Sequence, residues 1–214
     1  MSASGGEDEV PPPYLSTLKD GTSYFTRHPE PESWCCHGHV PGLDPVTHRR
    51  AVCVHEAGHL VVSLDVGMHV KTVEVDSYSW VPACGPRLDF TGAVTHAPYE
   101  LRHSAVIMQF AAGERAEQRW LREQGRWTEK RGWAAEMAAL NDRGRAIERL
   151  IALTGSYDLE TVLGRYVFLG DQVEGILDRH WPAVLAVAEA LDAAGELTGD
   201  QAAELAGLPN PMPA

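Results

Sequence analysis

The sequence predicts a mainly α-helical domain with a small β-hairpin or sheet beside one of its helices. Three observations favour this fold class. Apolar residues recur at spacings of three and four over several long segments after residue 44, two shorter segments between them have strand character, and capping signals flank the helical segments. With 214 residues, 44% of them hydrophobic, the chain is long enough for one globular core.

The acidic composition limits the partners of the chain. A formal net charge of -12 argues against a nucleic-acid or anionic-membrane surface. No apolar run approaches the roughly 18 residues that a bilayer span needs, and residues 1–33 lack the basic start and apolar centre of a secretion signal. We therefore expect a cytoplasmic protein whose four cysteines are free thiols. These are Cys35, Cys36, Cys53 and Cys84.

Residues 1–44 form a proline-rich arm that we expect to be irregular or draped over the domain. The arm ends in a cluster of thiols and imidazoles, Cys35, Cys36, His37 and His39. This cluster could bind a metal, or a thiolate from it could occupy and inhibit a metal site elsewhere in the chain. Because adjacent cysteines lack the C-x-x-C spacing of common zinc knuckles, we favour a segment anchored by Trp34 with incidental Cys and His.

The first predicted helix begins at Asp44 and Pro45, an N-cap followed by a first-turn proline, and stops near Gly67. One mostly apolar stripe of this helix carries two histidines. The stripe consists of Val52, His55, His59, Val62 and Val66.

The segment His55-Glu56-Ala57-Gly58-His59 contains the residues of this helix that could bind a metal and catalyse a reaction. Histidines four residues apart share one helix face and can bind the same Zn²⁺, while Glu56 can reach a water in the open coordination position. The alternative is a pair of core histidines that hydrogen-bond to backbone carbonyls. That alternative does not explain the adjacent Glu56.

Two strands are expected after this helix. Residues 69–76 alternate apolar and polar side chains, and residues 90–95 form a second strand beyond the turn at Gly85-Pro86. In many zinc peptidases an edge strand beside the zinc helix holds an extended substrate through main-chain hydrogen bonds. Thr91, Gly92, Ala93 and Val94 are our candidates for that strand, and an ordinary hairpin strand is the alternative.

The rest of the chain is predicted to be helical, with one polar loop at residues 125–132. A helix is expected from Pro98 to about Gln124, with Glu117 just beside its apolar stripe. Further helices are expected from Asn141-Asp142, over residues 157–179, and again from Pro182. A capping box at Thr198 predicts a short last helix, and residues 208–214 form a tail.

Two histidines leave a catalytic zinc short of its usual three protein ligands. In enzymes with the pattern H-E-x-x-H-x-x-G-x-x-H/D, the glycine turns the chain so that the third ligand swings back. Here Val62 replaces that glycine, so we expect Asp65, at the ligand position, to stay on the helix and point away. Glu117 and Asp142 are the other candidates.

Three motifs in order resemble the peptidase domain of the FtsH-type AAA proteases. The resemblance spans about residues 45–207, and it implies a zincin-like helical metallopeptidase domain. It also implies that His55, His59 and Asp142 bind Zn²⁺, with Glu117 supporting the site rather than binding the ion. The motifs are His55-Glu56-Ala57-Gly58-His59, Gly113-Glu114-Arg115-Ala116-Glu117 and Asn141-Asp142-Arg143-Gly144-Arg145-Ala146.

The sequence also departs from that family. No G-x-x-x-x-G-K-S/T segment is present, and no membrane anchor precedes the domain, so we expect a chain that does not unfold substrates with ATP by itself. Residues 121–133 form an Arg/Trp-rich insertion, and residues 137–140 replace a run of small residues. Substrate preference and ring assembly therefore do not carry over, and a homo-oligomer or a separate partner protein is left open.

These observations predict an ATP-independent zinc metallopeptidase that hydrolyses amide bonds in peptides or unfolded proteins, with Glu56 as general base. Two alternatives are a zinc-scaffold protein that regulates or binds a partner, and an amidohydrolase for small molecules. The expected organisation is an arm at residues 1–44, the peptidase domain at 45–207 and a tail at 208–214.

Overall fold

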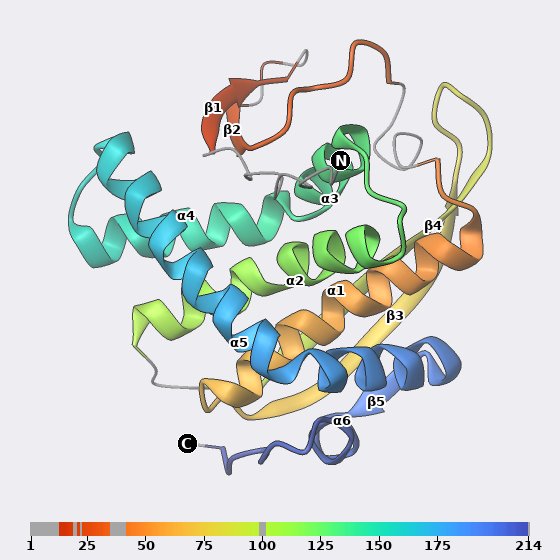
Figure 1. Cartoon of the computed structure of the whole chain (residues 1–214), viewed down its shortest axis with the longest axis vertical. Coiled ribbons are helices and arrows are strands. Elements are labelled where there is room, and N and C mark those ends of the chain that lie inside the picture. Colours follow the sequence, from red (N-terminus) through yellow and green to blue (C-terminus); the bar gives the residue numbers. More distant parts are fainter. Residues whose placement is uncertain (1–12, 19–20, 22, 35–41, 99–101, 214) are drawn as a thin grey trace, which may run out of the picture.

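The computed structural model describes residues 13–18, 21, 23–34, 42–98 and 102–213, and in these ranges it contains six helices and five strands. Helices dominate, and the larger of two small antiparallel sheets lies beside the first helix (Figure 1). The predicted mainly helical fold class with a small sheet is therefore confirmed. Among the described helices, none combines the length and the apolar character that a bilayer span requires.

Helix α1 (Pro45–Asp65) lies at the centre, with α2 (His103–Glu123) and α5 (Leu159–Ala194) packed beside it (Figure 1). Asp44 caps α1 by accepting a hydrogen bond from the Thr47 backbone N–H, and Pro45 occupies the first turn, as the sequence predicts. Most of α1 from Ala51 to Leu64 is buried. A helix buried on nearly all sides can hold polar side chains only where other elements supply their partners.

The sheet beside α1 has the strand order β4-β3-β5. Strand β3 (Val70–Trp80) pairs antiparallel with β4 (Arg87–His96) and with β5 (Glu196–Thr198). The two predicted strands are confirmed and are longer than expected, while β5 was not expected. Among the described residues, β4 is hydrogen-bonded only to β3 in this sheet, so in this part of the chain its other edge is unpaired and can accept a further extended chain.

Helices α3 (Glu129–Ala138) and α4 (Leu140–Thr154) follow α2. Helix α2 begins at His103 rather than at Pro98. The predicted loop at residues 125–132 is wrong in its second half. There Thr128 caps α3 by accepting from the Arg131 N–H, and Trp133 on this helix is fully buried.

The amino-terminal arm is not wholly irregular. Strands β1 (Tyr14–Thr17) and β2 (Ser23–Thr26) form a hairpin that lies against α3 (Figure 1). The Trp133 Nε1–H donates to the Tyr24 hydroxyl at 2.9 Å inside a small second core. A buried aromatic on α3 thus gives the hairpin a partner, which an isolated two-stranded hairpin needs.

The chain closes with α5 and α6 (Gly199–Ala206). Helix α5 breaks at His180, where φ is -116° and ψ is 15°, just before Pro182, where the sequence predicts a restart. Thr198 and Gln201 form the predicted capping box of α6.

The expectation that all cysteines are free thiols is wrong at Cys84, which is disulfide-bonded. Its partner lies outside the described residues, because Cys53 is free and buried. Burial raises the pKa of the Cys53 thiol to about 12, so this thiol stays protonated at neutral pH. The predicted cluster at Cys35, Cys36, His37 and His39 also lies outside the described residues.

Candidate metal centre

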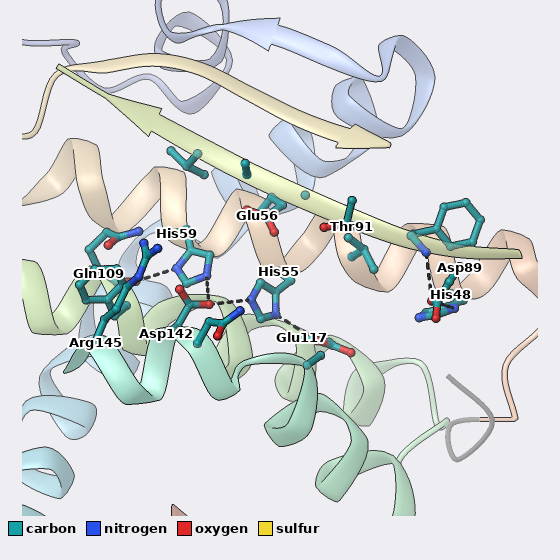
Figure 2. A pocket seen from close by; sticks show the side chains of 18 of the residues that line it. His48, His55, Glu56, His59, Asp89, Thr91, Gln109, Glu117, Asp142 and Arg145 are labelled. Atoms are coloured by element: carbon teal, nitrogen blue, oxygen red, sulfur yellow. Dashed lines mark hydrogen bonds and ion pairs between the residues drawn. The ribbon is translucent and has the colours of Figure 1, made fainter. Parts of the chain in front are cut away.

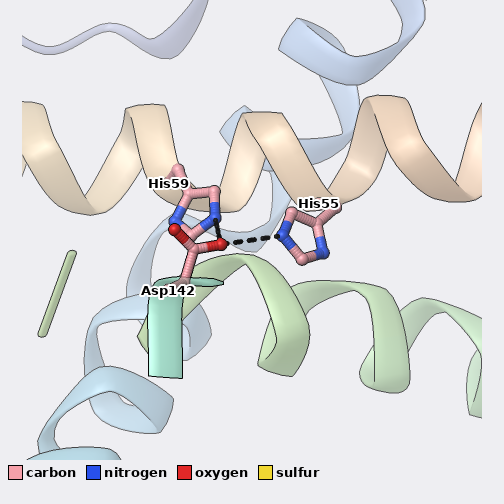
Figure 3. Close-up of side chains that lie close together, drawn as sticks. All are labelled: His55, His59 and Asp142. Atoms are coloured by element: carbon pink, nitrogen blue, oxygen red, sulfur yellow. Dashed lines mark ion pairs between the residues drawn. The ribbon is translucent and has the colours of Figure 1, made fainter. Parts of the chain in front are cut away.

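Two histidines and one aspartate meet between α1 and α4. His55 and His59 are 7% and 4% exposed on the face of α1 that faces α2 and α4, and Asp142 comes from the first turn of α4 (Figure 3). The Asp142 Oδ2 lies 3.8 Å from His55 Nε2 and 3.4 Å from His59 Nε2. One ligand atom from each residue lies within 4.8 Å of the other two, so the cluster could hold a metal ion.

The remaining nitrogen of each ring is held by another group, which fixes how the rings point. His59 Nδ1 donates to the backbone carbonyl of Gln109 at 2.7 Å. His55 Nδ1 lies 3.1 Å from the Glu117 carboxylate. Ligand histidines in metal sites usually bond a carbonyl or carboxylate through the outer nitrogen in this way, which leaves Nε2 for the ion.

Gly113 provides the space in front of the rings. A Cβ at this position of α2 would lie 2.4 Å from His59 Nε2 and 2.5 Å from His55 Nε2. Gly58 has a similar effect one turn away, since a Cβ there would lie 2.5 Å from Ala116 Cβ. Small residues on both helices therefore let α1 and α2 approach closely and keep both Nε2 atoms accessible.

The charges around the three side chains favour a cation between them. Burial would lower the pKa of His55, but its contacts with Asp142 and Glu117 outweigh burial and raise it well above the ordinary value. Burial would raise the pKa of Asp142, but the two histidines hold it well below its usual range. The raised pKa of His55 indicates that positive charge is favoured at this point, and the lowered pKa of Asp142 indicates that its carboxylate is ionised beside it.

The donor set fits a divalent ion. Donors about 2 Å from a tetrahedral ion lie roughly 3.3 Å apart, close to the Asp142 to His59 separation of 3.4 Å. Two neutral imidazoles and a carboxylate are ligands that catalytic zinc uses, and the fourth position is then open.

Glu56 lies between the histidines and the edge strand. Its side chain faces Gly92 of β4 so closely that a Cβ on Gly92 would lie 2.4 Å from Glu56 Cγ. Burial raises the pKa of Glu56; the two histidines oppose this shift, and the Asp142 and Glu117 carboxylates add to it. A carboxylate with a raised pKa is suited to accept and return a proton near neutral pH.

A cavity of about 760 Å³ opens over these groups (Figure 2). The β4 residues Thr91, Gly92, Ala93 and Val94 line it, together with the three candidate ligands, Glu56 and Glu117. The structure therefore brings the predicted strand residues beside the predicted ligands. The free edge of β4 and the ligand cluster share one cavity.

Asp65 does not take part in this centre. Its carboxylate lies 2.9 Å from His180 Nε2, at the other end of α1, as expected for a residue that stays on the helix. Glu117 contacts His55 through the outer nitrogen and does not belong to the ligand cluster. Of the acidic candidates, only Asp142 is placed with both histidines.

Three residues that contribute to this site were not identified as site residues from the sequence. Gln109 acts through its main-chain carbonyl, which leaves no side-chain signal. Gly113 lies in a quoted motif, but its role depends on how closely two helices approach. Arg145 lines the cavity, and its position three residues after Asp142 on a helix could have indicated this.

A search with models of known protein families finds none that matches this chain, and a search among curated proteins finds no significant match.

Proposed function

We propose that this protein is a zinc-dependent peptidase that hydrolyses amide bonds in peptides or unfolded protein segments. The proposal extends the resemblance to the FtsH-type peptidase domain and its zincin-like fold. The observation that carries it is the position of Glu56, a buried carboxylate that shares one cavity with three candidate ligands and a free strand edge. A metal site without catalysis needs the ligands but not this base.

The residues would hold Zn²⁺ through His55 Nε2, His59 Nε2 and Asp142 Oδ2. When bound, the ion would supply Lewis acidity, polarise the scissile carbonyl and lower the pKa of a water toward ~7. Two neutral imidazoles and one carboxylate would only partly neutralise the double positive charge of the ion. The remaining positive charge would attract a hydroxide or a carbonyl oxygen.

Glu56 then acts first as base and later as acid. Its carboxylate removes the proton of the attacking water and passes it to the leaving amine. The extended substrate lies along β4, whose unpaired backbone groups around Thr91 to Val94 hold it by main-chain hydrogen bonds. This arrangement requires an extended chain, which favours peptides and unfolded segments over folded proteins.

The charge of -12 supports a protein that does not act on nucleic acids or membrane surfaces. A cytoplasmic location is part of the proposal, but the disulfide at Cys84 weighs against it because disulfides are rare in reducing compartments.

The test compares the zinc-loaded protein with its Glu56→Gln variant on unfolded casein and on a peptide library, with and without a chelator. We expect chelator-sensitive cleavage by the wild type. The variant should retain its zinc and lose cleavage by at least about 10²-fold. A Glu56→Gln protein that remains fully active would contradict the mechanism.

The same experiment separates the two alternatives. A zinc-scaffold protein would retain zinc and leave every peptide intact. An amidohydrolase for small molecules would also leave peptides intact, but it would hydrolyse small amides in a chelator-sensitive way.

A further inference from the structure

The cavity is charged unevenly along its length. Four carboxylates line it, from Glu56, Asp89, Glu117 and Asp142, whereas Arg145 is the only Arg or Lys among its described lining residues. Figure 2 shows Arg145 at the end near Gln109, with His48 and Asp89 at the opposite end and the candidate ligands between them.

Three of the four carboxylates already have partners within the protein. Glu117 contacts His55, Asp142 contacts both histidines, and Asp89 lies 3.7 Å from His48 Nδ1. Arg145 differs from them. In the part of the chain that the structure describes, it makes no ion pair, and its guanidinium lies 5.9 Å from the centre of the Phe110 ring.

The nearby Arg143, on the same helix, has a structural role and differs from Arg145 in burial and in its partners. Its guanidinium is buried and bonded to Glu114 and Glu136. Arg145 is exposed and lines the cavity, where Figure 2 shows it beside Gln109. The planar fork of a guanidinium matches a carboxylate and can donate two parallel hydrogen bonds to it.

We propose that Arg145 binds a carboxylate of the substrate close to the scissile amide bond, and so selects peptides that carry a carboxylate at this position. This inference rests on the proposed function and names its substrate class. Arg145 follows Asp142 by three residues on α4, so a group bound to it lies beside the metal ligands. Asp89 repels a carboxylate at the other end, which fixes where the acidic group lies.

The carboxylate could be an Asp or Glu side chain or the free carboxyl terminus of a peptide. Binding of hydroxamates to the zinc-loaded full chain distinguishes them without catalysis, because a hydroxamate anchors its backbone at the metal. One series carries Glu, Gln or Lys beside the hydroxamate, and a second carries a free or an amidated carboxyl terminus. Calorimetry gives the dissociation constant of each compound.

In the wild type we expect the acidic member of one series to bind about tenfold more tightly than its neutral counterpart. The series that shows the preference identifies the source of the carboxylate. Arg145→Lys should keep part of the preference, and Arg145→Glu should remove it and favour the Lys compound. The control Arg149→Glu, on the same helix but not among the residues that line the cavity, should change nothing.

Equal affinity of the acidic and neutral compounds in the wild type, or an unchanged preference in Arg145→Glu, would overturn the inference and leave the proposed zinc site intact. Failure of every hydroxamate to bind the zinc-treated protein would instead contradict the proposed function, and this inference with it.

Discussion

Gly113 faces His55 and His59 at a distance that leaves no room for a methyl group. The histidines were found from sequence because H-E-x-x-H is a local pattern on one helix. Gly113 contributes because it has no side chain. The sequence pattern of α1 does not indicate which residues of other helices pack against α1. The role of Gly113 is visible only once α2 is placed.

Gly113→Ala should therefore abolish zinc binding while the protein stays folded. A Cβ there would lie 2.4 Å from His59 Nε2, and the rings would have to turn away from the ion. Zinc content after loading and desalting measures the loss. Gly144→Ala is the matched control, since nothing lies within 4 Å of the added carbon. Full zinc content in Gly113→Ala would contradict the placement of the two rings.

Zinc affinity should rise with pH through the range above about 6.5. Contacts with Asp142 and Glu117 raise the pKa of His55, so the free histidine keeps its proton above its ordinary value and zinc must displace it. The pKa of Asp142 is lowered, so its carboxylate is ionised over this whole pH range and adds no pH dependence to zinc binding. Competition with a chromophoric chelator between about pH 6 and 9 tests this. An affinity that does not rise with pH above 6.5, where the raised pKa of His55 keeps the free histidine protonated, would contradict it.

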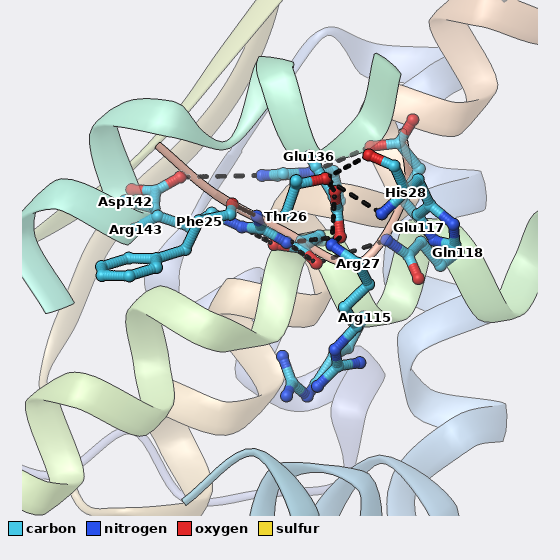
Figure 4. A network of polar contacts seen from close by, with 12 residues as sticks. Phe25, Thr26, Arg27, His28, Arg115, Glu117, Gln118, Glu136, Asp142 and Arg143 are labelled. Atoms are coloured by element: carbon cyan, nitrogen blue, oxygen red, sulfur yellow. Dashed lines mark hydrogen bonds and ion pairs between the residues drawn. The ribbon is translucent and has the colours of Figure 1, made fainter. Parts of the chain in front are cut away.

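At the scale of elements, α4 is held in place by a buried ionic network behind the metal centre (Figure 4). Arg143 contacts Glu114 of α2 at 2.5 Å and Glu136 of α3 at 2.8 Å, and it donates to the Phe25 carbonyl of β2. The Thr26 hydroxyl and the Arg27 backbone N–H also donate to Glu136. Asp142 precedes Arg143 directly, so this network positions the third candidate ligand.

The negative charge of Glu114 in this network is strongly stabilised. Burial would raise the pKa of Glu114, but Arg143 and Arg115 hold it at about 2. The carboxylate is thus ionised in the core, where an unpaired charge would be costly. The amino-terminal hairpin, α2, α3 and α4 depend on one another through this arginine.

Arg143→Ala should destabilise the protein by about 3–5 kcal/mol, because it leaves two buried carboxylates without their cation. Zinc affinity should fall roughly 10-fold or more as Asp142 loses its fixed position. Urea unfolding and zinc competition measure the two effects. The control Arg149→Ala, a half-buried residue of the same helix outside this network, should stay within about 0.5 kcal/mol of wild type. Unchanged zinc affinity in Arg143→Ala would show that the network does not position Asp142.

How well each element was predicted follows from where its signal lies. Helix α1 and the start of α6 were predicted because Asp44, Pro45 and the Thr198 capping box are local signals. The β1–β2 hairpin and α3 were missed because they are stabilised by contacts with each other. Trp133, interpreted as part of an Arg/Trp-rich insertion, is fully buried against Tyr24. Such tertiary contacts are not visible in a short sequence window.

At the scale of the whole molecule, the candidate metal centre joins α1 to α4, and its candidate ligands on these helices are separated by more than eighty positions in the chain. The residues alone did not distinguish Asp142 from Glu117 as the third candidate ligand. The prediction of Asp142 came from the resemblance of three ordered motifs to a known family. The structure places Asp142 between the histidines and Glu117 behind one of them. The resemblance therefore predicted that Asp142 lies beside the two histidines, which the periodicity of the sequence could not predict.

Removal of the ion should lower the melting temperature of the whole domain, since a ligand that binds only the folded state stabilises it. At a free zinc concentration 100 times the dissociation constant, the gain is about 2.7 kcal/mol. For a chain of this size, that corresponds to roughly 5–10 °C. His59→Ala should show the lower melting temperature with or without zinc. A wild-type melting curve unaffected by chelation would exclude a metal shared by α1 and α4.

The central claim is that His55, His59 and Asp142 bind one ion together. Elemental analysis of purified, zinc-loaded and desalted protein tests it most directly, with Asp142→Ala measured beside the wild type. The account predicts about one zinc ion per wild-type chain and almost none in the variant. A wild type without zinc, or an Asp142→Ala protein that retains a full equivalent, would contradict it.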